Sequence, residues 1–298
     1  MEKPEKEWDK SMGFLRSVLA LLGSVIGIVL LAGGACVFYA FRIEPYRLQV
    51  NEYRLSGGGE GAEEITVVQF SDLHIKEGFT YEDLDKVVAA INEQEPDIVV
   101  FTGDLYDHYA RYHDDENIIK QLASIEADHG KLAIWGNRDH GGGAVRQYGA
   151  IMERAGFRLL RNENWCISIN DQKKVLFTGV DDAMLGDPYV PDPAETEDSD
   201  YRILLTHEPD PVEDYSKYGY NMVLSGHSHG GQVNFPFLPQ INEAALSATA
   251  LAEMYSQGMY ELNADGSSRL YVNTGIGTTH IPVRFGVVPE VAVFHIRL

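Results

Sequence analysis

The N-terminal part of the chain changes abruptly from a polar, mixed-charge stretch to an apolar one. Residues 17–41 contain no charged side chain, and Arg16 and Arg42 flank them. A helix needs about 20 apolar residues to cross a bilayer, so this run predicts a single transmembrane helix. A cleaved signal peptide is the alternative, but its apolar region is usually shorter. Basic residues before the run slightly outnumber those after it, which favours a protein of the cell membrane whose C-terminal domain is extracytoplasmic.

The next part of the chain alternates between short apolar runs and amphipathic segments. The pattern predicts a strand at 46–55, strands at 65–70, 98–101 and 131–135, and helices near 80–91, 114–127 and 144–155. Strands that alternate with helices favour a mostly parallel sheet with helices on its faces. Ligands of such sheets bind at the carboxyl ends of the strands.

The second half of the chain is dominated by predicted strands. They lie at 158–169, 173–180, 201–205, 222–224, 259–262, 269–273 and 291–296, and the first two are expected to pair antiparallel. An acidic, proline-bearing loop occupies 181–200. A partly apolar segment at 235–255 either forms an apolar groove or dips into the membrane interface, or it packs on the core.

These patterns divide the chain into four consecutive parts. We expect a charged tail at 1–16 that is disordered near its start, the transmembrane helix at 17–41, a tether with the first strand and a glycine-rich loop at 42–64, and one large domain at 65–298. The composition adds one exclusion. A net charge of −21 disfavours nucleic acid as a partner, because its binding depends on cationic contacts to phosphate.

Side chains suited to metal binding follow several of the predicted strands. They are Asp72, His74, Asp104, Asn137, His207, His227 and His229. Each alone has an ordinary explanation, such as a turn aspartate or a core histidine, but their common position at strand ends favours one site. Oxygen and nitrogen ligands without thiolate suit Mn²⁺, Fe or Zn²⁺. The set exceeds what one ion needs, so we expect two divalent metal ions that share a carboxylate.

The sequence blocks around these residues resemble the calcineurin-like metallophosphoesterases over residues 65–232. Two later blocks, 275–279 and 282–285, are similar to the membrane-anchored or exported bacterial branch. The resemblance implies an α/β fold, a four-layer αββα sandwich of two mixed β-sheets flanked by helices. It also implies hydrolysis of a phosphoester at a dinuclear site, where Asp72, His74, Asp104 and His229 hold one ion. Asn137, His207 and His227 complete the other, with Asp104 bridging.

The residue after the metal-binding asparagine departs from the common family pattern. Many relatives have histidine there, whereas this chain has Arg138, which offers a donor fork for phosphate oxygens but is no general acid. The same Gly-Asn-Arg-Asp block occurs in the family's UDP-diacylglucosamine hydrolases, so the resemblance implies a pyrophosphate or phosphoester of a lipid-linked or membrane-associated substrate. Alternatively, Arg138 pairs with Asp107, and His140 is a candidate acid. The competing function is a catalytically silent metal-binding scaffold.

Overall fold

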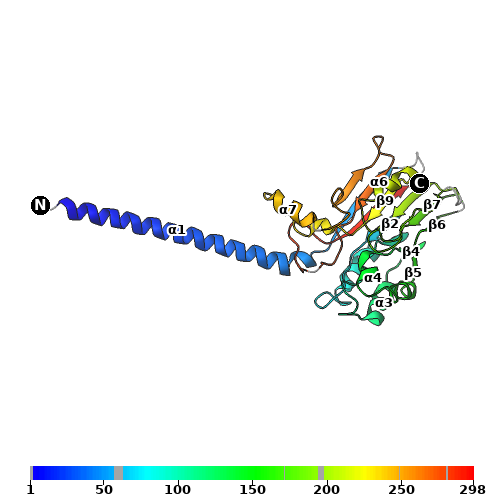
Figure 1. Cartoon of the computed structure of the whole chain (residues 1–298), viewed down its shortest axis with the longest axis horizontal. Coiled ribbons are helices and arrows are strands. Elements are labelled where there is room, and N and C mark those ends of the chain that lie inside the picture. Colours follow the sequence, from blue (N-terminus) through cyan, green and yellow to red (C-terminus); the bar gives the residue numbers. More distant parts are fainter. Residues whose placement is uncertain (1–2, 57–62, 171, 194–197, 248, 280) are drawn as a thin grey trace. The chain divides into compact units, whose positions relative to one another are not determined.

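The computed structural model describes residues 3–56, 63–170, 172–193, 198–247, 249–279 and 281–298 (Figure 1). The chain divides into two units, Met1–Ile43 and Glu44–Leu298. Nearly all of the expected glycine-rich loop and part of the expected acidic loop lie outside the described residues.

The first unit is formed by the helix α1 (Lys3–Arg42). Its apolar part is long enough to cross a membrane and has a mean hydropathy of 2.4, although a signal sequence near an N-terminus has the same character. The helix begins within the stretch that we expected to be disordered. A proline in the first turn and the good helix formers that follow explain this difference.

The first sheet of the second unit has the strand order β1-β12-β2-β3-β4-β5. These strands are β1 (Gln49–Ser56), β2 (Glu64–Phe70), β3 (Ile98–Phe101), β4 (Gly130–Ala133), β5 (Phe157–Leu159) and β12 (Glu290–Arg297). The strands β2 to β5 are parallel, as the strand–helix alternation predicted, and β12 is antiparallel to β2. The helices α2 (Leu84–Asn92), α3 (Asp115–Ala123) and α5 (Tyr148–Arg154) connect them.

The second sheet has the order β10-β11-β9-β8-β7-β6. Its strands are β6 (Glu163–Ser168), β7 (Lys174–Gly179), β8 (Tyr201–Leu205), β9 (Met222–Ser225), β10 (Gly258–Glu261) and β11 (Arg269–Val272). The single strand expected at 158–169 is therefore two strands, β5 and β6, in different sheets. Asn162 has a φ of 52°, a left-handed conformation that turns the chain between them.

Alternation of side chains along the strands builds the layers. In β2, Val67 contributes to the core between the two sheets, whereas Val68 packs in the cluster that contains residues of α2, α3 and α5. In β8, Ile203 belongs to the inter-sheet core and Leu204 packs with Val212 of the short helix α6 (Val212–Tyr215). Helices thus cover the outer face of each sheet, which confirms the predicted αββα sandwich.

The apolar segment expected at 235–255 contains the helix α7 (Pro239–Leu246). Just before it, Phe237 is 88% exposed, and Ile241 within it is 44% exposed. These side chains therefore lie on the surface of the second unit and do not pack into its core.

Candidate metal centre

The carboxyl ends of strands from both sheets bring the predicted metal ligands together. Asp72 and His74 follow β2, Asp104 follows β3, Asn137 begins the short helix α4 (Asn137–Gly141) after β4, His207 follows β8, and His227 and His229 follow β9. All are buried except Asn137, which is half-buried. Residues up to 157 positions apart in the chain, such as Asp72 and His229, therefore share one site because their strands end at the same edge of the sandwich.

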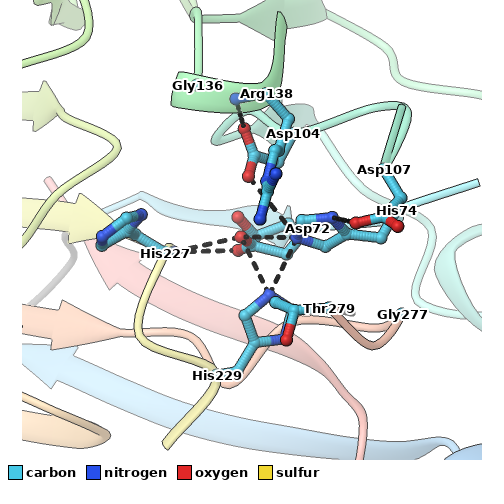
Figure 2. Close-up of polar contacts among 12 residues, drawn as sticks. Asp72, His74, Asp104, Asp107, Gly136, Arg138, His227, His229, Gly277 and Thr279 are labelled. Carbon is cyan, nitrogen blue, oxygen red and sulfur yellow. Dashed lines mark hydrogen bonds and ion pairs between the residues drawn. The ribbon is translucent and has the colours of Figure 1, made fainter. Parts of the chain in front are cut away.

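The first group of ligands gathers around Asp72 and His229. The Nε2 atoms of His74 and His229 lie 2.9 Å apart, and His229 Nε2 lies 3.4 Å from Asp72 Oδ1. Figure 2 shows Asp72 at the centre, with dashed lines that run to His227 and His229. His74 Nε2 is also 3.4 Å from Asp104 Oδ2. Their donor atoms point toward a common centre.

The second group surrounds the amide of Asn137. Asn137 Oδ1 lies 3.2 Å from His207 Nε2 and 3.1 Å from His227 Nδ1. His207 Nε2 is 3.5 Å from Asp104 Oδ1. The Asp104 carboxylate therefore presents Oδ2 to the first group and Oδ1 to the second.

The residues present fit divalent metal ions. Sets of three donors within 4.8 Å of one another are formed by Asp72, His74 and His229 and by Asp72, Asp104 and His207. Imidazole and carboxylate donors without thiolate are typical of Mn²⁺, Fe and Zn²⁺ sites. Such a concentration of buried carboxylates is costly unless cations accompany it.

The backbone at the ligands is strained. Asp72, His74, Asp104, His227 and His229 have φ values of 52°, 44°, 64°, 69° and 50°, in the left-handed region that side-chain-bearing residues rarely adopt. Strain of this kind persists where the surrounding structure imposes it, and it is concentrated at functional sites. It aims the side chains inward as each strand ends.

Outer hydrogen bonds orient the histidine ligands. His207 Nδ1 lies 2.7 Å from the carbonyl oxygen of Thr102, and His227 Nε2 lies 2.8 Å from that of Ala250. Each ring donates an N–H to a carbonyl and leaves its other nitrogen facing the ligand cluster, as is usual for metal-binding histidines.

Asp107, which the sequence suggested as a partner of Arg138, lies behind His74. Its Oδ1 is 3.4 Å from His74 Nδ1, and its Oδ2 is 3.9 Å from Lys76 Nζ. Burial raises the pKa of Asp107, but the close contact with the His74 ring and the charges of Lys76, His74 and Arg138 outweigh burial and hold the pKa below its ordinary value. The carboxylate is therefore placed to orient His74.

Arg138 and His140 lie in different environments. Arg138 lines a cavity with the metal ligands, and its backbone N–H donates to Asp104 Oδ1 at 2.7 Å. His140 instead places Nε2 3.0 Å from Asp181 Oδ1, with its ring 4.6 Å from that of Trp135. The structure thus brings Arg138, and not His140, to the wall of the cavity.

Asp139 is a site residue that the sequence reasoning missed. Its buried carboxylate accepts the backbone N–H groups of Asp104 at 2.8 Å, Leu105 at 3.0 Å and Gly136 at 2.9 Å. Burial, together with the charge of Asp104, raises the pKa of Asp139 to about 7. The carboxylate joins the loop after β3 to the loop after β4. The signal available in the sequence was an acidic residue only two positions after Asn137.

Arg284 was also missed. It is fully buried, and its guanidinium donates to the carbonyl oxygens of Thr274, Gly275, Gly277 and Val287. Its Nη2 lies 3.3 Å from His229 Nδ1. Arg284 thus fixes the loop that borders His229, and an arginine among apolar residues was the signal in the sequence.

The cavity in front of the ligands has a volume of about 490 Å³. Besides Arg138, its described lining residues include the ligands His74, Asp104, Asn137, His227 and His229 and several residues from 231–233, 249–250 and 279–283. This volume is in the range of pockets that hold small organic ligands.

Comparisons with known proteins match residues 65–231 to the family described as "Calcineurin-like phosphoesterase". The Bacillus subtilis (strain 168) protein named "Uncharacterized metallophosphoesterase YkuE" is 36% identical over 97% of this chain and 99% of its own length. An Aquifex aeolicus (strain VF5) protein named "Uncharacterized metallophosphoesterase" is 30% identical over 87% of this chain and 93% of its own. Among solved structures, Haemophilus influenzae NAD nucleotidase covers 72% of this chain and 46% of its own length, with 12% identity and a TM-score of 0.46.

Proposed function

Because this chain belongs to the calcineurin-like phosphoesterase family, we propose that it is a metal-dependent hydrolase of phosphoester or pyrophosphate bonds. The observation that carries the proposal is the placement of Asp104. One of its carboxylate oxygens faces His74 and the other faces His207, as expected of a carboxylate that bridges two ions.

The ligand groups suggest how two divalent ions, Mn²⁺, Fe or Zn²⁺, are divided. Asp72, His74, Asp104 and His229 would hold the first ion. Asp104, Asn137, His207 and His227 would hold the second. When bound, such a metal pair supplies Lewis-acid charge to the phosphoryl group and lowers the pKa of water. The protein contributes the fixed positions of the donors, through the outer hydrogen bonds of His207 and His227.

Arg138 is the residue we assign to the phosphoryl oxygens. It lines the same cavity as the metal ligands, and its planar fork binds two oxygens at once. A guanidinium does not release a proton at neutral pH. The reaction therefore favours a leaving group that needs little protonation, such as a phosphate within a pyrophosphate.

The proposed substrate is membrane-associated or lipid-linked, a phospholipid or a compound of the UDP-diacylglucosamine type. The second unit starts at Glu44, directly after the first unit, whose helix ends at Arg42. If α1 spans the membrane, a connection this short gives the second unit little reach into solution, because each extended residue adds only about 3.6 Å. The slight excess of basic residues before the apolar run favours a location of this unit outside the cytoplasm.

Replacement of Asp104 by alanine tests the proposal against the scaffold alternative. Full-length protein is assayed on a chromogenic phosphodiester with added Mn²⁺, and its metal content is measured. We expect the variant to lose turnover and bound metal, because one carboxylate contacts both ligand groups. Asp200→Ala is the matched control, since its exposed carboxylate accepts a backbone N–H from Lys174 away from the site. A wild type that binds two ions but hydrolyses no phosphoester would establish the scaffold.

A further inference from the structure

The cavity at the metal centre has a second side that the proposed chemistry does not use. Val233, Ile281 and Val283 also line it, and we call these three residues the apolar wall. Met184, which is 40% exposed, also contributes to the lining. Ile281 is 59% exposed, so this side chain remains in contact with solvent until something covers it.

Hydrogen bonds between two segments hold the apolar wall in place. Val233 and Phe285 form a parallel β-bridge, in which Phe285 N–H donates to the Gln232 carbonyl at 2.9 Å and Asn234 N–H donates to the Phe285 carbonyl at 2.6 Å. The rings of Phe235 and Phe285 pack behind it with centroids 4.7 Å apart. The wall is thus formed before any ligand arrives, which lowers the entropic cost of binding.

The other lining residues limit the chemical classes of ligand that the cavity can bind. Among the described lining residues there is no Phe, Tyr or Trp, and Arg138 is the single Lys or Arg. A nucleobase is usually bound by stacking on such rings, at about 1–3 kcal/mol per base. A polyanion needs several cationic contacts. Neither a nucleobase nor a polyanion therefore fits a wall made of aliphatic side chains.

We propose that the apolar wall binds an alkyl or acyl chain carried by the phosphoester whose phosphoryl group lies at the metal ligands. The inference rests on the proposed function, and it narrows the substrate class to aliphatic esters such as phospholipids. Wall and ligands line one cavity of about 490 Å³, so a substrate bound at the ligands has its non-reacting part beside Ile281 and Val283. Burial of each methylene contributes about 0.8 kcal/mol, or about fourfold in affinity.

The test compares p-nitrophenyl methyl phosphate with p-nitrophenyl hexyl phosphate, hydrolysed by full-length protein in lipid nanodiscs of one composition. We expect the wild type to prefer the hexyl ester by tenfold or more in kcat/KM. Ile281→Ser should reduce this preference about threefold to tenfold, and Ile281→Leu should retain it. Ile241→Ser is the matched control, because Ile241 is also exposed but is not among the residues that line the cavity. It should keep the wild-type preference.

Binding of hexylphosphonate and methylphosphonate, measured by calorimetry, separates this inference from the proposed hydrolysis. Tighter binding of hexylphosphonate that Ile281→Ser abolishes upholds the apolar wall even in a protein that cleaves neither ester. Equal binding of the two phosphonates overturns it. An equal loss of chain-length preference in Ile241→Ser and Ile281→Ser also overturns it, because α7 or the lipid would then account for the preference.

Discussion

Gly103 stands where the two ligand groups meet, and its replacement by alanine tests whether backbone packing sets the site. It has a φ of 97° and precedes Asp104. A Cβ at this position would lie 2.7 Å from Gly136 N, 2.8 Å from Gly136 Cα and 2.9 Å from His207 Nδ1. Two of these atoms are backbone, so no flexible side chain can move aside.

The free energy of unfolding that Gly103→Ala is expected to lose has two parts. Alanine in this unfavourable backbone region costs about 1–3 kcal/mol. The close contacts add about 1–3 kcal/mol of overpacking, and relieving them moves His207 or Gly136 away from Asp104. Gly130→Ala is the control, because Gly130 has a φ of 122° but a Cβ added there would meet no atom within 4 Å. Gly130→Ala should therefore lose only the part of the unfolding free energy that comes from the unfavourable backbone conformation.

Urea unfolding of the full-length protein in detergent gives the two stability losses, and Mn²⁺ titration gives the affinities. We expect Gly103→Ala to lose about 1–3 kcal/mol more than Gly130→Ala and to bind metal at least tenfold more weakly. Equal stability losses in the two variants, with unchanged metal affinity in both, would refute the reasoning.

Three further predictions concern Arg138, Asp107 and the first unit. Arg138→Ala should keep both metals and lose activity, with partial rescue by lysine, because an ammonium lacks the planar fork; Asp107→Asn should instead weaken metal binding about 10–100-fold, because the partner of His74 loses its negative charge. Metal content measured beside activity distinguishes these roles, and metal loss in Arg138→Ala would contradict the assignment. Full-length protein should remain in the membrane fraction after a carbonate wash, whereas its release as a shorter, cleaved chain would show that α1 is a signal sequence.

The strands and their terminal side chains could be predicted because their signals are local. Each buried strand is a short apolar run, and the ligands follow directly after it, so Asp72 and Asp104 were placed from sequence alone. The break between β5 and β6 could not be placed in the same way. Residues 158–169 have one continuous strand-like pattern in the sequence. Only in the folded domain does the first part pair with one sheet and the second part with the other. Asn162, with its left-handed φ of 52°, turns the chain between the two strands.

Asp139 and Arg284 escaped the sequence reasoning for a different physical reason. Their partners are backbone groups from distant parts of the chain, and a sequence does not show where an unpaired N–H or carbonyl will point. Asp139 binds the N–H of Asp104, and Arg284 binds carbonyls that border His229. Asp104 and His229 both have left-handed φ, a conformation that residues with a Cβ seldom adopt. The sequence specifies which side chains can bind metal, whereas these buried charges hold the strained backbone that makes the side chains converge.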